Sequence, residues 1–303
     1  MRYVVTGAAG FIGSHLAERL QADGHDVAGI DSFTDYYDPA LKEENARELD
    51  VRRLDLAEDG VDFAGVDAVF HLAGQPGARS FGDVFPLYLR RNVLATQRVF
   101  EAAVAAGVPV VWASSSSIYG DAEAFPTGED VVPRPNNPYG ITKHACEHLH
   151  AAYARSFGLH AVALRYFTVY GPRQRPDMAF ARVVEALTRG ERFEVYGDGS
   201  QSRSFTYVGD VVDATIQAVG AAPGIYNVGG GEEASLRDAI AVLEELAGKT
   251  LDVDYGPPQV GDMQRTRADT SRIERELGWH ATTPLRRGLA DHWAWASARV
   301  GAA

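Results

Sequence analysis

Tyr139 and Lys143 lie four residues apart in residues 138–143 (PYGITK), where a helical pattern begins. On a helix this spacing places both side chains on one face. A phenol is a poor base at neutral pH, but a cation held within a few ångströms can lower a phenol's pKa by about one to three units. Tyr139 is therefore a candidate for exchanging a proton with a substrate hydroxyl. The same spacing is frequent by chance, so the rest of the chain decides between the two interpretations.

A glycine-rich turn at residues 6–13 (TGAAGFIG) joins a short apolar run to a helical pattern. Gly7 allows the tight turn, Gly10 lets the backbone approach a pyrophosphate, and Gly13 lets helix and strand pack closely. A second apolar run ends in Asp31, about where a carboxylate accepts hydrogen bonds from an adenosine ribose. Because that carboxylate would repel a 2′-phosphate, the pattern predicts NAD rather than NADP. The alternative is that Asp31 is an aspartate at the surface end of a strand and has no role in binding NAD.

Apolar runs of strand length alternate with helical patterns in the first half of the chain. The expected strands span residues 3–5, 26–30, 51–56, 67–70, 108–113 and 160–165, and the long helices span 85–106 and 138–157. Most of these strands are apolar throughout, which is typical of a parallel sheet covered by helices on both faces. The sequence therefore predicts an α/β fold with a Rossmann-type, doubly wound parallel sheet. Ligands of such sheets bind at the carboxyl ends of the strands, where the glycine turn and a serine run at residues 114–117 both fall.

The composition changes after Phe167, where a turn-rich basic segment follows. We expect residues 1–168 to form a dinucleotide-binding domain, and we expect the chain to return to this domain at about 204–228. The return consists of the segment 203–219 and a strand that ends at residue 228. We expect residues 169–303 to form a smaller α/β substrate domain over the cleft. Its expected helices lie near 235–247, 271–277 and 284–298.

Composition narrows the classes of function. The chain carries 29 Lys and Arg against 41 Asp and Glu, a formal net charge of -12, which argues against nucleic acid or an anionic membrane as the main partner. The single cysteine, Cys146, lies in a helical pattern and is expected to be a buried small side chain. The strand that follows Met1 leaves no room for a signal peptide, and no apolar run is long enough to span a bilayer. We expect a cytoplasmic protein without a metal site.

Five motifs occur in the order that is typical of the extended short-chain dehydrogenase/reductases. They are residues 6–13, Asp31, residues 71–74 (HLAG), the serine run with its continuation Ile118-Tyr119-Gly120, and Tyr139 with Lys143. Within that family, residues 165–172 (RYFTVYGP) and Gly261-Asp262 resemble nucleotide-sugar epimerases. The resemblance covers essentially the whole chain. It implies NAD held throughout the cycle, a UDP-sugar substrate, and a homodimer formed through the two long helices.

The resemblance also implies catalytic roles. Tyr139, assisted by Lys143, would remove the proton of the sugar 4-hydroxyl while hydride leaves C4, and Ser115 would donate a hydrogen bond to the same oxygen. Dehydratases and decarboxylases of the family carry an acidic residue in the stretch that matches residues 115–117, so the serines here favour epimerisation. The residues implied in NAD binding are Gly7, Gly10, Phe11, Ile12, Gly13, Asp31, Asp55, Leu56, Leu72, Ala73, Asn92, Tyr139 and Lys143.

The sugar-binding motifs depart from those of galactose-type 4-epimerases, which usually carry asparagine where Thr168 stands and arginine where Gln259 stands. Residues 35–38 (DYYD), Gln75 and residues 175–179 (RPDMA), together with Thr168, Gln259 and Gly261-Asp262, instead resemble uronate 4-epimerases. In that group, the residues that match Thr168 and Arg175 bind the sugar carboxylate. Two alternatives for Arg175 are binding of the diphosphate and bracing of its own loop. The implied substrate-binding residues are Ser115, Ser116, Ser117, Thr168, Arg175, Arg203, Gln259, Asp262 and Arg79, with Arg265 as a further candidate for the diphosphate.

Three functions are open on these grounds. The first is an NAD-dependent 4-epimerase of UDP-glucuronate, and the second is a UDP-glucose or UDP-N-acetylglucosamine 4-epimerase. The third is a dinucleotide sensor on the same scaffold without turnover. A sensor would be expected to lose the tyrosine, the lysine or the serine, and this chain has all three.

Overall fold

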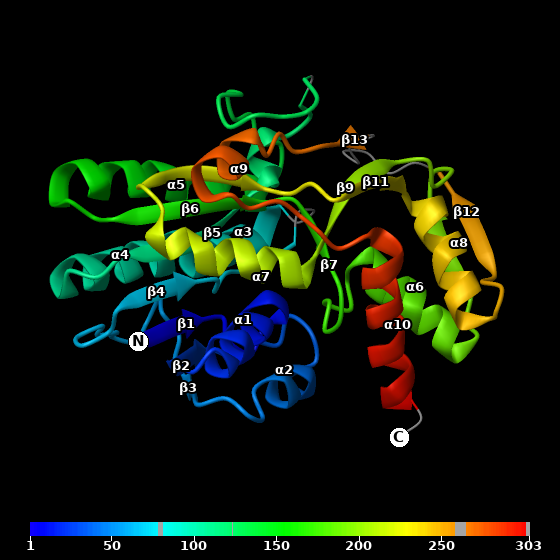
Figure 1. The fold of residues 1–303 in the computed structure, drawn as a ribbon, viewed down its shortest axis with the longest axis horizontal. Helices are drawn as coiled ribbons and strands as arrows, with labels where there is room; N and C mark the ends of the chain where they lie inside the picture. Colours follow the sequence, from blue (N-terminus) through cyan, green and yellow to red (C-terminus); the bar gives the residue numbers. More distant parts are fainter. Residues whose placement is uncertain (78–80, 123, 258–264, 301–303) are drawn as a thin grey trace.

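The computed structural model describes residues 1–77, 81–122, 124–257 and 265–300. Figure 1 shows a large sheet flanked by helices and, beside it, a smaller group of strands and helices that includes the C-terminal helix. Three residues that the sequence predicts in the substrate site, Arg79, Gln259 and Asp262, lie outside the described residues.

The large sheet has seven parallel strands in the order β10-β6-β5-β4-β1-β2-β3. Their bounds are β1 (Arg2–Thr6), β2 (Asp26–Asp31), β3 (Val51–Arg53), β4 (Ala68–His71), β5 (Val110–Ser115), β6 (Ala161–Tyr166) and β10 (Gly224–Val228). The strand order reverses at β1, because β2 and β3 lie on one side of it and the later strands on the other. This is the predicted doubly wound Rossmann-type sheet, and its ligand crevice is expected where the order reverses.

Each side of the large sheet is covered by its own helices. They are α1 (Phe11–Ala22), α7 (Val208–Gln217) and α9 (Ser271–Leu277) on one side, and α4 (Ala95–Ala106) and α5 (Pro138–Phe157) on the other. Successive strand residues face opposite sides, so that Val5 packs with the first group and Val4 with the second. Burial on both faces is why the strands are apolar throughout.

The helix α9 corrects the expectation that residues 271–277 belong to the smaller domain. Ile273 and the following Trp279 are buried in the core of the large sheet, beside Tyr226 of β10. The indole of Trp279 donates a hydrogen bond to the carbonyl of Asp210 in α7 at 2.9 Å. A helix of two turns carries an apolar pattern that shows it is buried, but the pattern does not show against which sheet.

Strand β9 (Ser202–Tyr207) lies in the small domain, so only the helical part of the segment 203–219 returns to the large one. There β9 pairs with β7 (Thr168–Tyr170), β11 (Glu232–Ser235) and β13 (Arg265–Thr266). A separate pair consists of β8 (Phe193–Tyr196) and β12 (Val253–Gly256). The helices α6 (Ala179–Arg189), α8 (Leu236–Ala247) and α10 (Leu285–Val300) complete this domain around its own apolar core.

The long helix expected at 85–106 consists of three consecutive pieces. These are α3 (Phe85–Tyr88), a π-helical segment η2 (Leu89–Leu94), and α4. The remaining short helices are α2 (Pro39–Asn45), η1 (Gly82–Val84), η3 (Ser116–Tyr119) and η4 (Ala218–Gly220). Among the described residues, no helix has the length and apolar character that crossing a membrane requires, and no group of three or more His, Cys, Asp or Glu is placed to hold a metal ion.

Candidate active site

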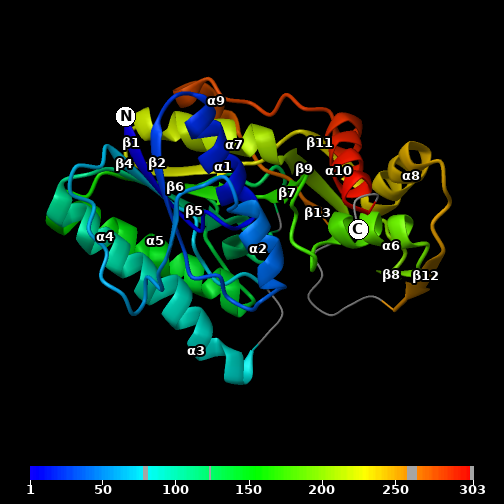
Figure 2. The same cartoon turned by 90° about the horizontal axis from the view of Figure 1, so that it is seen from below.

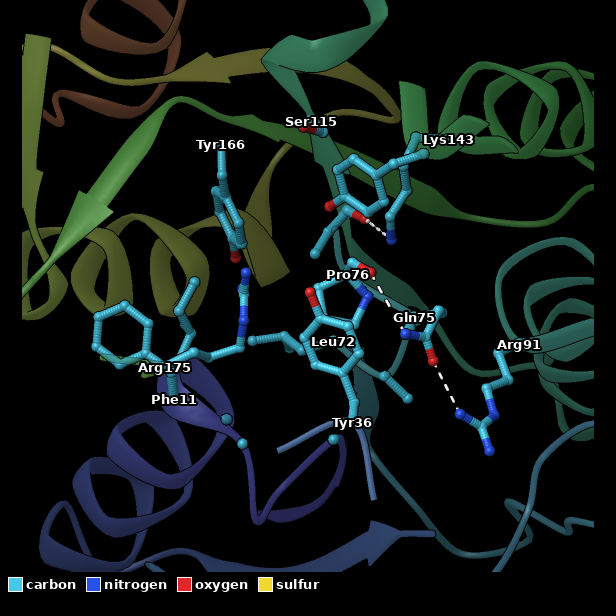
Figure 3. A pocket seen from close by; sticks show the side chains of 18 of the residues that line it. Phe11, Tyr36, Leu72, Gln75, Pro76, Arg91, Ser115, Lys143, Tyr166 and Arg175 are labelled. Carbon is cyan, nitrogen blue, oxygen red and sulfur yellow. Dashed lines mark hydrogen bonds between the residues drawn. The ribbon is translucent and has the colours of Figure 1, made fainter. Parts of the chain in front are cut away.

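A cavity of about 400 Å³ opens at the carboxyl ends of the strands, between the large sheet and the small domain (Figure 3). One end is lined by the glycine turn and the end of β2, and the other by the serine run, the start of α5 and residues 166–169. Arg175 and Arg203 reach it from the small domain. The cavity therefore connects the residues that the sequence predicts for NAD with those that it predicts for the sugar.

The glycine turn needs glycine for steric reasons. Gly7 has a φ of +72°, a conformation that side chains with a Cβ rarely adopt. A Cβ on Gly13 would lie 2.0 Å from the carbonyl oxygen of Gly7, so only glycine lets α1 begin this close to the turn. The amide of Asn45 in α2 donates to the carbonyl of Ala9 at 3.1 Å and holds the turn from its outer side. The result is an exposed backbone rim in front of α1, which suits a pyrophosphate.

Asp31 ends β2 beside this turn. Its carboxylate accepts hydrogen bonds from the amides of Ala9 at 3.1 Å and Phe33 at 2.8 Å, one on each oxygen. Burial raises the pKa of Asp31 above its ordinary value, while these two amides oppose that shift. Because a carboxylate has about four acceptor positions, two remain for the hydroxyls of a ribose.

The tyrosine and the lysine lie on the first turns of α5. Asn137 caps this helix by accepting a hydrogen bond from the amide of Gly140 at 2.8 Å, and Pro138 occupies the first helical turn. Lys143 is buried, and its ammonium donates to the carbonyl of Ala113 in β5 at 2.8 Å. Its nitrogen lies 5.8 Å from the centre of the Tyr139 ring. Both side chains line the cavity, with a fixed positive charge beside the phenol.

Ser115 is the last residue of β5 and also lines the cavity. Its hydroxyl oxygen accepts a hydrogen bond from the amide of Ser117 at 3.1 Å, which leaves the hydroxyl proton for a substrate oxygen. The neighbouring Ser114 donates instead to the carboxylate of Glu147 in α5 at 2.6 Å. Ser116 and Ser117 follow in η3 and line the cavity as well.

Behind the serines lies a buried ion pair between Glu147 and Arg165, with two hydrogen bonds at 2.9 and 2.8 Å. Both side chains are almost fully buried, with 6% and 4% of their surface exposed. Arg165 also donates to the hydroxyl of Tyr119 at 2.7 Å. Since Glu147 follows Lys143 by one helical turn, the pair fixes α5 against β5 and β6 at the level of the site.

We expect Glu147→Gln to lower the free energy of unfolding by roughly 3 kcal/mol, because the buried guanidinium of Arg165 loses its counterion. Urea unfolding followed by circular dichroism measures the change. The double variant Glu147→Leu with Arg165→Met is the control, and it should lose less stability than the single variant because no charge is left unpaired. A loss below about 1 kcal/mol for Glu147→Gln would contradict this account.

Two further residues that the sequence singles out lie outside the cavity lining. Asn92, in the π-helical segment, is buried; its side chain accepts from the amide of Gln75 at 2.6 Å and donates to the hydroxyl of Thr142 at 3.0 Å. It therefore supports the loop after β4 and the start of α5. Arg265 pairs with Glu233 through two hydrogen bonds, at 2.7 and 2.8 Å, on the small sheet. A contact between Arg265 and the diphosphate stays a prediction.

The other described residues that the sequence predicts for the site all line the cavity. They are Gly7, Gly10, Phe11, Ile12, Gly13, Asp31, Asp55, Leu56, Leu72, Ala73, Tyr139, Lys143, Ser115, Ser116, Ser117, Thr168, Arg175 and Arg203. Further lining residues that the sequence did not predict include Tyr36, Gln75, Arg91, Tyr166 and Thr266. A signal existed for Tyr36 and Gln75, because both stand in segments that resemble uronate 4-epimerases. Arg91 carries no such signal and is identified by its hydrogen bond to the side chain of Gln75 at 2.8 Å.

A model of the NAD dependent epimerase/dehydratase family matches residues 3–229, most of the large domain and part of the small one. The chain belongs to this family. The UDP-glucose 4-epimerase of Mycolicibacterium smegmatis is 37% identical to it over 304 residues, which cover 96% of each chain. The UDP-glucuronic acid 4-epimerase of Bacillus cereus, solved with UDP-glucuronic acid and NAD, is 36% identical with a TM-score of 0.93 and covers 99% of this chain and 100% of its own.

A third similar protein is MoeE5, which has been solved with NAD and either UDP-glucuronic acid or UDP-glucose. The complex with UDP-glucuronic acid is 42% identical with a TM-score of 0.88 and covers 99% of this chain and 100% of its own. The protein is therefore an NAD-dependent isomerase, a UDP-sugar 4-epimerase, and not a sensor without turnover. Since these relatives differ in their sugars, the residues of the site must indicate the sugar.

NAD fits the site of this epimerase on structural grounds. The glycine turn leaves a backbone rim at the start of α1 for the pyrophosphate, and Asp31 keeps acceptor positions for the adenosine ribose. Asp55 and Leu56 line the cavity beyond β2, and Leu72 and Ala73 line it after β4.

Proposed function

We propose that this epimerase inverts C4 of UDP-glucuronate and so produces UDP-galacturonate. The observation that supports the uronate is the guanidinium of Arg175, which lines the same cavity as the serine run and Thr168. A guanidinium and several hydroxyls bind a carboxylate through charge-assisted hydrogen bonds. The neutral sugar is the second candidate, because one relative is a UDP-glucose 4-epimerase and MoeE5 has been solved with both sugars.

The residues of the cavity supply the proton transfers. Tyr139, as the phenolate, takes the proton of the sugar 4-hydroxyl as C4 becomes a ketone and so becomes the phenol. Lys143 keeps a positive charge beside the phenolate before this transfer. Ser115 donates its hydroxyl proton in a hydrogen bond to the same sugar oxygen. NAD, when bound, supplies the chemistry of accepting a hydride from C4 and returning it. Tyr139 then gives its proton back to the inverted C4 oxygen, so the cycle has no net redox change.

The carboxylate needs to be held for a second reason. A 4-keto uronate is a β-keto acid, which loses carbon dioxide easily. The bond that joins the carboxyl carbon to the sugar ring breaks only when it can overlap with the π orbitals of the ketone. A carboxylate clamped in the plane of the sugar is kept from that geometry. We propose that Arg175 and the hydroxyls around it provide this clamp, so that epimerisation outpaces decarboxylation.

Proton NMR of the purified protein tests the proposal directly. The protein is incubated with NAD and either UDP-glucuronate or UDP-glucose in separate samples, and the anomeric and H4 signals are followed. Conversion of the uronate to its 4-epimer, with UDP-glucose much slower, is the expected result. Conversion of UDP-glucose alone would transfer the assignment to the neutral sugar.

We also propose that two copies pair through the outer face of α4 and α5. Figure 2 shows α3, α4 and α5 side by side along one edge of the molecule. Exposed apolar side chains in this region include Leu89 and Leu94 of η2, between α3 and α4, and Ile141 of α5. Burying them between two copies would form a four-helix bundle, as the resemblance to the family implies.

We expect Leu94→Glu to convert the dimer to a monomer, because a carboxylate would then be buried in the helix interface. Size-exclusion chromatography with light scattering measures the mass in solution. Tyr255→Glu, at an exposed aromatic on β12 of the small domain, is the control and should leave the dimer intact. A wild-type protein that elutes as a monomer would rule out this interface.

A further inference from the structure

Arg175 is held by an ion pair that no sequence motif predicts. Its Nε donates to one carboxylate oxygen of Asp177 at 3.0 Å and its Nη2 donates to the other, also at 3.0 Å. One of these oxygens accepts a third hydrogen bond, from the hydroxyl of Tyr36 at 3.2 Å. Asp177 is exposed, whereas the guanidinium of Arg175 lines the cavity. The aspartate thus holds one edge of the guanidinium of Arg175, and the side chain of Arg175 lines the cavity (Figure 3).

The donors of the guanidinium show what this pairing leaves for a ligand. An arginine carries five N–H donors in a planar fork. Asp177 occupies the donor on Nε and one on Nη2, which form the side of the fork. Both donors on Nη1 and the second donor on Nη2 remain, and the end of the fork is formed by this Nη2 donor with one of the Nη1 donors. That edge binds a second carboxylate with two parallel hydrogen bonds.

Tyr36 joins the pair to the other side of the cleft. It lies on the loop after β2, in the large domain, whereas Arg175 and Asp177 lie on the loop after β7. Burial and the nearby carboxylate of Asp177 raise the pKa of Tyr36 to about 12, so its hydroxyl is protonated and donates. The loop of Arg175 is also tied to α1, because Arg173 pairs with Glu18 at 2.8 Å. Arg175 is therefore fixed from two directions.

We infer that Asp177, held by Tyr36, is a positioning residue that presents the free end of the Arg175 fork to the carboxylate of the sugar. This inference rests on the proposed uronate substrate. Asp177 does not touch the sugar in this arrangement; it acts by fixing the plane of the guanidinium. The pair also keeps the guanidinium of Arg175 beside a carboxylate when the ligand has none. Losing Asp177 should therefore weaken the binding of a uronate and not that of a neutral sugar.

Titration calorimetry on the NAD-loaded protein tests this with UDP-glucuronate, UDP-glucose and UDP as ligands, and NMR rates give kcat and KM. We expect Asp177→Asn to raise the Kd and KM for UDP-glucuronate about tenfold, with kcat changed less than about twofold. The affinities for UDP-glucose and UDP should stay within about twofold of wild type. Tyr36→Phe should weaken the uronate in the same direction by a smaller factor, about threefold.

Two controls separate positioning from other effects. Asp35→Asn makes the same substitution at an exposed carboxylate beside Tyr36 and should change nothing. In an Arg175→Ala background, Asp177→Asn should have no further effect on the uronate, because there is no guanidinium left to orient.

Each other outcome overturns the inference in its own way. Equal weakening of all three ligands would mean that Asp177 only supports the loop. Tighter binding of UDP-glucuronate by Asp177→Asn would mean that the aspartate competes with the sugar carboxylate for Arg175. A wild-type protein that turns over UDP-glucose but neither binds nor converts UDP-glucuronate would overturn the proposed substrate itself. Calorimetry of the wild-type protein distinguishes this outcome from the first two.

Discussion

Replacing Tyr139 with phenylalanine should lower kcat by about 10²- to 10⁴-fold while the Kd for the UDP-sugar changes little. The variant keeps the ring that lines the cavity and loses only the hydroxyl that exchanges a proton with the sugar. Lys143 stays in place in this variant, because its Nζ donates to the carbonyl of Ala113 at 2.8 Å. Initial rates from NMR at saturating substrate, together with calorimetric binding, measure both quantities.

Ser115→Ala is the comparison for this prediction. The hydroxyl of Ser115 donates one hydrogen bond to the reacting oxygen and does not accept the proton, so we expect a smaller loss in kcat than for Tyr139→Phe. Thermal unfolding of both variants should match that of the wild type. Turnover close to the wild-type rate in Tyr139→Phe would show that another group is the base and that the assignment of Tyr139 is wrong.

Replacing Arg175 with alanine should lower kcat/KM for UDP-glucuronate by about 10- to 100-fold, the usual contribution of hydrogen bonds to a charged group. The value for UDP-glucose should change by less than about threefold, because that sugar has no carboxylate for the guanidinium to bind. The fraction of product that has lost carbon dioxide should rise, because the carboxylate is no longer clamped. NMR of the reaction mixture measures the epimer and the decarboxylated sugar together.

Arg173→Ala is the matched control, since Arg173 lies on the same loop but pairs with Glu18 of α1. This variant tests whether the loss of any arginine from the loop lowers kcat/KM for UDP-glucuronate because the loop is no longer braced. An equal loss for UDP-glucuronate, UDP-glucose and UDP in Arg175→Ala would instead indicate that Arg175 binds the diphosphate.

Much of the fold and the cofactor end of the site could be predicted from local patterns. The turn around Gly7 and Gly13 depends on steric limits within a few residues, and Asp31 follows from the length of one strand and one helix. Tyr139 and Lys143 share a face because helical geometry places residues four apart together. These features depend on contacts between residues that are close in the sequence, which is why the sequence alone indicated them.

Only the tertiary structure decided which partners the other side chains have. Ser114 and Ser115 are neighbours in one serine run and both line the cavity. The hydroxyl of Ser114 donates to Glu147 in α5, whereas that of Ser115 accepts from the amide of Ser117, because β5 directs successive side chains to opposite faces. Arg265, a candidate for the diphosphate, pairs with Glu233 on the small sheet, and no local pattern indicated that partner.

The sugar end of the site shows the same division. The motif around Arg175 indicated a carboxylate-binding arginine, but not how its guanidinium is oriented. That orientation comes from Asp177 and Tyr36, and Tyr36 lies 141 residues away from Asp177 in the chain. Local sequence sets which residue types are present and which face of a strand or helix they share. The contacts between loops of two domains are set by how the domains pack, and no short-range pattern in the sequence records them.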